Sequence, residues 1–426
     1  MKRLVIAAAA ACALLLGHAG VARAAGRADV QTLTFRSGPI TVQPYFTAQG
    51  ASVAPSPGVD GYVVGMSADV VDEAGNVVPY SDVMLHHVVF AKILSPDSTC
   101  GSIDGIPAER FYAEGEERYS MALPDGYGYP NAGASVWGLA YMLMNHRARA
   151  QTVFIRYTVR YVTGGSLTPV TPVWLDVRNC RSDPVWDVPG TGGTGSSYAQ
   201  SYEWIAASGG RLVAGGAHLH GGGLRLQLAD ATCGRALFES QPSWLNTEPH
   251  PILHEVSPSH MTSFTTSIGI PVAAGDRLRL TASYDNSLPH TRVMGIMIVY
   301  LAPAPVSGCP SIPPLELDPG TPGPPPLAPL PIATQPKGPV RKVRGTWVGD
   351  YRFGVGRAQV KAGSMFTWRF VGSVSHNVTL ANGPIGFSSP SLRGGATYSY
   401  RFARKGVYQL VCSLHPVAMT EIVTVR

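Results

Sequence analysis

The chain lacks long apolar runs, dense charge and helical periodicity. Beyond residues 1–24, no stretch approaches the roughly 18 apolar residues that a membrane-spanning helix needs, so we expect no stable membrane insertion. Only 14% of the residues are charged, whereas glycine (48) and proline (36) are abundant among short runs of Val, Thr and Tyr. Residues 152–162 and 277–285 alternate as half-buried strands do. The sequence therefore predicts an all-β protein.

Nucleotide-binding and hydrolase signatures are also missing. No Walker-type glycine loop, nucleotide fingerprint or Ser/His/Asp arrangement stands out. The chain instead opens with Lys2 and Arg3, continues with apolar residues 4–16, and reaches a small-x-small site that ends at Ala24. Because this is the pattern of a secretory signal, we expect residues 1–24 to be cleaved and the protein to be exported, to the periplasm or outside the cell. Nucleic acid is then not an expected partner.

Cysteine is scarce, and five cysteines remain beyond the expected signal peptide: Cys100, Cys180, Cys233, Cys309 and Cys412. In an oxidising compartment the first four can form two disulfides in three ways. We favour Cys100 with Cys180 and Cys233 with Cys309, because each pair then stays within one half of the body. Cys412 is left over and needs another explanation.

Two changes in composition divide the chain. Residues 310–345 are saturated with proline, which predicts a semi-rigid extended linker that does not pack as a sheet. A weaker glycine-rich break lies at 189–197. We therefore predict two tandem jelly-roll-like β-sandwiches, at 25–188 and 198–309, followed by a third β module at 346–426.

Charge differs in sign between these parts. Residues 25–309, the body, hold 17 Lys and Arg against 23 Asp and Glu, a net of −6. Residues 346–426, the tail module, hold 9 against 2, a net of +7. We expect the body and the tail module to attract each other, and salt to weaken that attraction.

The tail module carries a compact group of metal-ligand residues. Cys412, His415 and Met419 fall within eight residues between two apparent strands, and His376 can return from a neighbouring strand. A thiolate, two imidazoles and a weak axial thioether are what a blue-copper electron-transfer site requires. A buried free cysteine beside a chance histidine is the alternative, but the spacing, the strand context and the upstream histidine all favour copper.

These residues resemble the cupredoxin (plastocyanin-like) family, whose pattern is His-Asn-Val on one strand and Cys-x-x-His followed by Met on the last loop. The resemblance covers residues 346–426 and implies a small Greek-key sandwich with one type 1 copper site. It implies Cys412 as the thiolate ligand, His376 and His415 as the equatorial nitrogens and Met419 as the axial ligand. The role of copper ligand also explains why Cys412 has no disulfide partner.

Two pairs of histidines stand out in the body. In the stretch "GGAHLHGGG", His218 and His220 face the same side if the segment is a strand, and the glycines leave room for a metal and its substrate. A polar strand face is the alternative. His86 and His87 are adjacent inside an apolar strand, where a buried imidazole needs a partner such as a metal. Because neighbours on a regular strand face opposite ways, joint ligation requires a twist, a bulge or binding through different ring nitrogens.

The order His-His, His, His-x-His, Met resembles the copper type II, ascorbate-dependent monooxygenases, the peptidylglycine and dopamine hydroxylase family. The likeness covers residues about 30 to 305, and "HTRVMG" and "LMNH" are also similar to the plant stress-upregulated nodulin family. The likeness to the monooxygenases implies an electron-storing copper held by His86, His87 and His146. It also implies a copper that binds dioxygen and abstracts hydrogen, held by the predicted catalytic residues His218, His220 and Met294. For Met294, ordinary core packing is the alternative.

The sequence departs from the peptide-amidating members of that family. Where they place an arginine and polar residues to grip a peptide carboxylate, this chain has Gly216, Ile296 and Ile298. We therefore do not expect peptide amidation. Three further histidines fit no strand or helix site, and we expect them at the surface or behind a ligand: His250, His254 and His260.

Together these features predict an exported copper oxidoreductase, a monooxygenase-like hydroxylase of a small organic substrate. We expect up to two copper ions in the body, with electrons supplied by the blue-copper module. Tethering would raise the local concentration of this donor to roughly millimolar. An external electron donor or acceptor is an expected partner. One alternative is a non-catalytic copper-binding or electron-transfer protein, and another is a body that serves as a glycine-rich binding scaffold with vestigial ligands.

Overall fold

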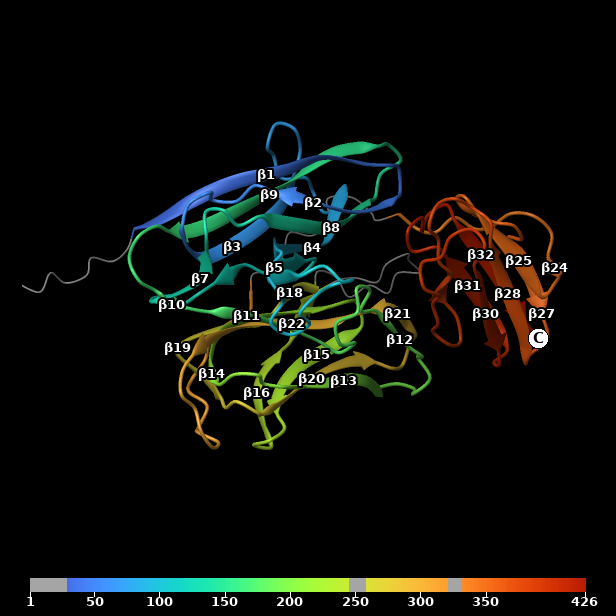
Figure 1. Ribbon diagram of the computed structural model, residues 1–426. Coiled ribbons are helices and arrows are strands. Elements are labelled where there is room, and N and C mark those ends of the chain that lie inside the picture. Colours follow the sequence, from blue (N-terminus) through green and yellow to red (C-terminus); the bar gives the residue numbers. More distant parts are fainter. Residues whose placement is uncertain (1–28, 245–257, 321–330) are drawn as a thin grey trace, which may run out of the picture.

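The computed structural model describes residues 29–244, 258–320 and 331–426. The predicted signal peptide, His250 and His254 lie outside these ranges. The described residues form strands and turns, so the all-β prediction is confirmed. Figure 1 shows two sandwiches stacked on each other and a third β module beside them. Within the described ranges no helix is long and apolar enough to cross a membrane.

The first sandwich packs two sheets face to face. One sheet has the strand order β1 (Val30–Val42), β9 (Gln151–Val162), β3 (Gly61–Val71), β7 (Tyr127–Asn131) and β10 (Thr168–Pro169), with β6 (Met121–Ala122) also on β3. The other has the order β2 (Thr47–Ala54), β8 (Trp137–Asn145), β4 (Val83–Ile93) and β5 (Ala108–Gly115). Large aromatic side chains fill the space between them, among them Trp137, Tyr112, Phe90 and Phe111.

The second sandwich also has two main sheets. The first has the order β11 (Thr171–Asp176), β22 (Gly295–Pro303), β14 (Gly210–Leu219), β19 (Ser263–Val272) and β23 (Glu316–Asp318). The second has the order β13 (Ser197–Ile205), β20 (Arg277–Asp285), β15 (Gly223–Asp230) and β16 (Arg235–Ser240). Two short pairs complete it, β12 (Trp186–Val188) with β21 (His290–Val293) and β17 (Pro242–Trp244) with β18 (Pro258–Met261).

The boundaries of the second sandwich differ from the compositional breaks. Strand β11 falls within the range predicted for the first sandwich, yet it pairs with β22 of the second. Strand β23 falls in the proline-rich linker, yet it pairs with β19. The expectation that no part of this linker packs as a sheet was therefore wrong for residues 316–318, and also for residues 341–342, which pair with residues 358–359 of the tail module. Local composition missed β11 and β23 because the pairing of an edge strand depends on a partner far away in the sequence.

The outer surface of β14 and β22 packs on the first sandwich. Val213, Ile298 and Tyr300 belong to the same buried cluster as the aromatic core of the first sandwich. The Tyr300 hydroxyl donates to the Phe111 carbonyl at 3.0 Å, across the boundary. A shared core resists sliding of one sandwich over the other. Side chains of the first sandwich therefore keep fixed distances from side chains of the second.

Both predicted disulfides are present, Cys100–Cys180 and Cys233–Cys309, and Cys412 is buried as a free thiol. The first disulfide joins the β4–β5 connection of the first sandwich to the segment after β11 of the second. It therefore ties the two sandwiches together covalently.

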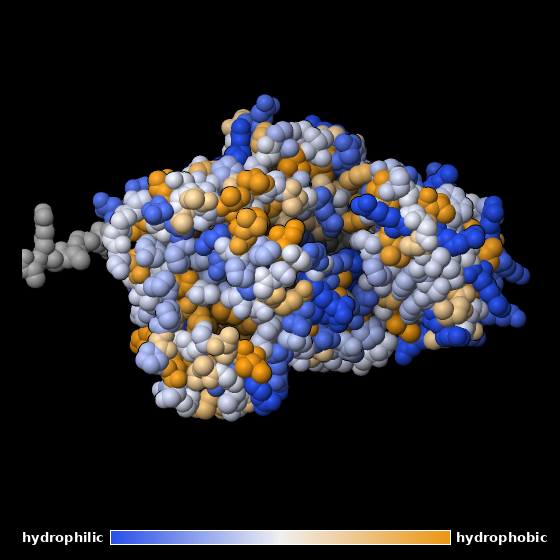
Figure 2. All heavy atoms as spheres, viewed as in Figure 1, coloured by the Kyte–Doolittle hydropathy of each residue, from blue (hydrophilic) through white to orange (hydrophobic). Residues whose placement is uncertain are grey.

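The tail module is a sandwich of mixed parallel and antiparallel pairs. One sheet has the order β24 (Arg341–Lys342), β27 (Arg357–Val360), β32 (Thr420–Val425), β31 (Gly406–Val411) and β29 (Thr379–Asn382). The other has the order β26 (Arg352–Phe353), β25 (Gly345–Gly349), β28 (Ser364–Phe370) and β30 (Thr397–Phe402). Strongly hydrophilic residues cover much of its visible face in Figure 2.

The tail module packs directly against the body. The Asp187 carboxylate accepts hydrogen bonds from the backbone N–H of Ser388 at 2.7 Å and from its hydroxyl at 2.9 Å. The backbone N–H of Thr47 donates to the Leu414 carbonyl at 3.1 Å. Thr291 donates through its hydroxyl to the Leu380 carbonyl at 2.8 Å. Of the residues in these contacts only Asp187 is charged. The effect of salt on the docking stays a prediction.

Candidate metal centres

The four predicted ligands of the tail module are buried together. The Cys412 Sγ lies 3.7 Å from the His376 Nδ1 and 3.6 Å from the His415 Nδ1, and these two nitrogens are 3.1 Å apart. The loop closes on itself, because the backbone N–H of Cys412 donates to the Met419 carbonyl at 3.1 Å. Three donor atoms therefore converge on one point, with the fully buried Met419 on the same loop.

Asn377 holds the two ligand segments in register. Its backbone N–H points to the Cys412 Sγ at 3.4 Å, and its side-chain amide exchanges hydrogen bonds with Ser413 at 2.7 and 2.8 Å. Burial, with the neighbouring His376, lowers the pKa of His415 to about 4, so the ring is neutral at pH 7. Burial raises the pKa of the Cys412 thiol, so a metal must displace its proton.

In the body, a bulge turns both adjacent histidines to one side. The register of β4 against β8 shifts between Leu85 and His87, which leaves His86 as the extra residue. The two imidazoles meet with their Nδ1 atoms 3.2 Å apart. The bulge that joint ligation requires is therefore present.

His218 and His220 lie near each other at the end of β14. Their ring centroids are 5.0 Å apart and the ring planes are at 86°. The Tyr284 hydroxyl accepts a hydrogen bond from the backbone N–H of His220 at 2.8 Å and donates to the Met294 carbonyl at 2.6 Å. Tyr284 thereby fixes the methionine beside the His-x-His segment.

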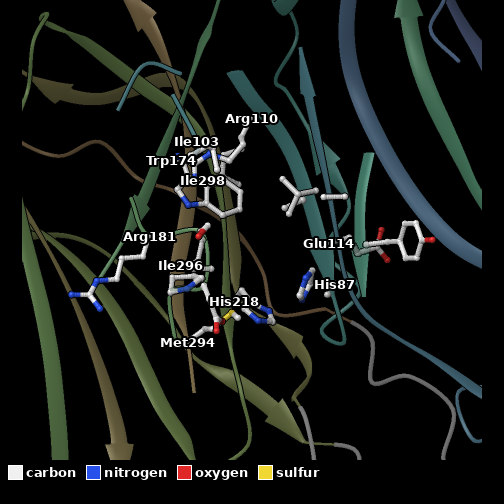
Figure 3. Close-up of a pocket in the computed structure, with 18 of the residues that line it drawn as sticks. His87, Ile103, Arg110, Glu114, Trp174, Arg181, His218, Met294, Ile296 and Ile298 are labelled. Atoms are coloured by element: carbon white, nitrogen blue, oxygen red, sulfur yellow. The ribbon is translucent and has the colours of Figure 1, made fainter. Parts of the chain in front are cut away.

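The two predicted ligand groups of the body meet. The rings of His86 and His220 are 5.0 Å apart at 85°, close to the 4.8 Å between His376 and His415 in the tail. Figure 3 shows His87 facing His218 and Met294 across a gap. Burial, followed by the charge of His218, lowers the pKa of His87 to about 4, which keeps its lone pair available. The four histidines therefore form one continuous group, which we call the histidine cluster.

Two buried carboxylates adjoin the histidine cluster, and the sequence reasoning missed them. The Glu117 Oε2 lies 2.8 Å from the His218 Nδ1, and the Glu116 Oε1 lies 3.6 Å from the His86 Nε2. Both residues follow β5 in a turn. Burial raises the pKa of Glu116 well above its usual range. The signal was the stretch "EGEE", which places three carboxylates within four residues directly after an apolar strand.

The structure does not bring His146 to the histidine cluster. Its backbone N–H donates to the Asp82 carbonyl and its Nδ1 lies 3.2 Å from the Tyr80 carbonyl. Met142 is the residue opposite His87, and four residues of strand, about 13 Å, separate it from His146. The expectation that His260 lies at the surface or behind a ligand was wrong, because it pairs with Ser243 in the β17–β18 ribbon and is buried there.

Two cavities reach the histidine cluster. The larger, about 450 Å³, runs between the sandwiches to His87, His218 and Met294. The smaller, about 110 Å³, is bordered by three of the histidines, by Met142, Met144 and Met294, and by tail residues that include Leu380, Val411 and Ser413. Ser413 follows the tail ligand Cys412 directly. The tail module therefore forms part of the wall of a cavity that the body histidines share.

Residues 142–304 match the family described as Stress up-regulated Nod 19. The matched range contains His218, His220 and Met294 but begins after His86 and His87. Two relatives, from Cochliobolus lunatus and a Phoma species, are named probable copper-dependent oxygenases. Each is 26% identical over 233 residues, or 51% of this chain, which cover 71% and 57% of those proteins respectively.

Further similarities are to amicyanins and to a purple cupredoxin. Amicyanin-alpha from Methylorubrum extorquens is 32% identical over 79 residues, which are 18% of this chain and 66% of that protein. A purple cupredoxin structure from Nitrosopumilus maritimus is 33% identical over 16% of this chain and 75% of its own, with a TM-score of 0.15. An amicyanin structure is 26% identical over 19% and 80%, with a TM-score of 0.18.

Proposed function

We propose that this protein is a copper-dependent oxidoreductase that hydroxylates an organic substrate with electrons delivered by its own cupredoxin-like module. One observation carries the proposal: the histidine cluster and the loop of the tail ligands border the same cavity. The relatives named as copper-dependent oxygenases and as amicyanin support copper as the metal. Two disulfides support export, because they persist in oxidising compartments.

The donor set of the body fits copper. Within the described residues, the His218 Nε2 is buried and has no hydrogen-bond partner, while its Nδ1 is held by Glu117. A carboxylate on one ring nitrogen directs the other nitrogen toward a metal and raises its basicity. The Met294 thioether is a soft donor that suits Cu(I). His218, His220 and Met294 would hold the copper that meets dioxygen, and His86 and His87 would hold the second copper.

The docked tail gives electrons a short route. The Thr47 hydroxyl donates to the Ser413 carbonyl at 3.2 Å, and Thr47 pairs with Met144 on β8. Strand β8 in turn pairs with β4, which carries His86 and His87. A hydrogen-bonded path therefore leads from the residue after Cys412 to the histidine cluster. Because the module is docked, its position relative to the histidine cluster is fixed.

Copper bound by these residues would supply the one-electron chemistry with dioxygen. Hydroxylation of a C–H bond places one oxygen atom in the product and the other in water, and it consumes two electrons and two protons. The chain itself would orient the substrate in the larger cavity and keep bulk water from the buried histidines. Glu117 would keep the Nδ1 proton of His218 in place, so that the ring binds through Nε2.

A copper carrier is the second candidate function. Met142, Met144 and Met294 line the smaller cavity together with three histidines. Thioethers and imidazoles in one cavity suit retention of Cu(I) as well as its reaction. A carrier would bind copper in the body but would not consume oxygen.

Oxygen uptake by the copper-loaded full chain, with ascorbate as reductant, separates the two functions. The oxygenase predicts uptake that His218→Ala and Met294→Ala abolish. His260→Ala, which removes a buried histidine far from both cavities, should leave the uptake unchanged. Body copper without uptake under any reductant would refute the oxygenase and favour the carrier.

A further inference from the structure

The larger cavity has mainly apolar walls along its length. Val89 and Ile103 come from the first sandwich, and Trp174, Ile296 and Ile298 come from the second. Trp174 and Ile298 are cross-strand neighbours on β11 and β22. Figure 3 shows Ile296, Ile298 and Trp174 following one another along one wall that ends at Met294 and His218. A bound molecule would therefore lie along apolar side chains with one end at the histidine cluster.

Most titratable side chains around this cavity are hydrogen-bonded or ion-paired within the protein. Arg110 pairs with Asp97 and Arg292 with Asp183, each at 2.8 Å. The buried Glu114 and Glu117 contact Arg118 at 3.2 Å and the His218 Nδ1 at 2.8 Å. Burial raises the pKa of Glu114 to about 8, so this carboxyl is largely neutral at pH 7. The Arg110 guanidinium carbon also lies over the Trp174 ring, 4.4 Å from the ring centroid. These side chains already have partners within the protein, so a ligand would have to compete with those partners.

Arg181 is the remaining cation among the described lining residues. It is exposed at the rim, and Figure 3 shows its guanidinium turned away from His218 and Met294. An ionic group that enters the cavity must lose its water without gaining a charged side chain as a partner. That desolvation is costly for either sign of charge, whereas a neutral apolar molecule gains from it.

We propose that the larger cavity binds a neutral, largely apolar organic molecule and discriminates against anions and cations of the same shape. This inference rests on the proposed function, because the bound molecule would be the substrate of the proposed oxygenase. The end of the substrate that reacts would lie at His218 and Met294, and the rest along Trp174 and Ile298. Specificity would then come from the absence of a charged partner as much as from apolar contact.

Three probes that share one ring system test the proposal. They are 2-acetylnaphthalene, which is neutral, 2-naphthoate, which is an anion of nearly the same shape, and 2-(aminomethyl)naphthalene, which is a cation at pH 7. Binding is measured by calorimetry on the full chain, both copper-free and loaded with Cu(I) without oxygen. We expect the ketone to bind at least about tenfold more tightly than either ion in both forms. Equal or tighter binding of an ion would overturn the proposal.

A gain-of-affinity variant protects the test against simple loss of folding. Ile298→Arg places a cation in the apolar wall, so naphthoate should bind about tenfold more tightly and the ketone more weakly. Ile298→Leu keeps the wall apolar and should preserve the preference for the ketone. Ile268→Ala, at an exposed position on β19, is the surface control. If Arg181→Ala abolished naphthoate binding by the natural chain, the cavity would hold an anion site and the proposal would be wrong.

The outcomes also separate this inference from the proposed function. Binding of the ketone without oxygen uptake would refute the oxygenase and leave the ligand class standing. Oxygen uptake with a preference for naphthoate would support the oxygenase and refute the ligand class. Ketone binding that Ile298→Arg leaves unchanged would place the site elsewhere and refute the inference.

Discussion

Removal of the Glu117 charge should weaken copper binding in the body and leave the tail copper intact. The Glu117 Oε2 lies 2.8 Å from the His218 Nδ1, and its Oε1 accepts the Gly115 N–H at 3.0 Å. Glu117→Gln keeps the shape and the capacity to accept hydrogen bonds, but it removes the negative charge beside the His218 Nδ1. Carboxylates in this position contribute roughly 10- to 100-fold to metal affinity, or about 1.4 to 2.8 kcal/mol.

The assay is competition for Cu(I) between the full chain and a coloured chelator. The tail site acts as an internal reference, because its copper is reported separately by blue absorption after oxidation. Glu117→Ala should weaken the body site further than Glu117→Gln. Glu203→Gln, on an exposed ion pair of β13, is the matched control. Unchanged affinity in both Glu117 variants would refute the claim that this carboxylate directs His218 toward a metal.

Three other predictions concern the tail module. Cys412→Ser should remove the blue absorption and leave the copper of the body in place; persistent colour would disprove the ligand assignment. Asp187→Ala removes the acceptor of the Ser388 hydrogen bonds, so electrons should pass more slowly from the tail to the histidine cluster, and an unchanged rate in flash photolysis would contradict the docking argument. Burial raises the pKa of Glu421 from 4.5 to about 8 while the Trp368 indole N–H donates to it. The folded module therefore holds a proton that the unfolded chain releases, so stability should fall between pH 4.5 and 8, by at most about 5 kcal/mol, and then level off. In Glu421→Gln, calorimetric melting between pH 5 and 9 should lack this slope.

The tail centre could be predicted because its information is local. Cys412, His415 and Met419 lie on one loop, and only His376 must arrive from elsewhere. The period of two likewise predicted that His218 and His220 share a face. The disulfide pairing followed from keeping each pair within one half of the body, and the structure confirms it.

The parts that escaped prediction depend on contacts between distant segments. The 5.0 Å approach of His86 to His220 results from the packing of one sandwich on another, which no periodicity encodes. The register of β8 carries His146 away from His87, and a register cannot be read from one strand alone. Glu117 was missed because a carboxylate in a turn is expected in solvent until the fold buries it.

The extra residue in β4 has a consequence for the interior of the first sandwich. Val83 and Leu85 precede it, Val88 and Phe90 follow it, and all four belong to one buried cluster although their numbers change from odd to even. If all these residues paired regularly, without the bulge, one pair would stay inside and the other pair would turn out. Deletion of His86 would instead make the register continuous and leave Leu85 two positions from Val88, so both pairs should stay in the core and the variant should lose a ligand rather than the interior of the first sandwich.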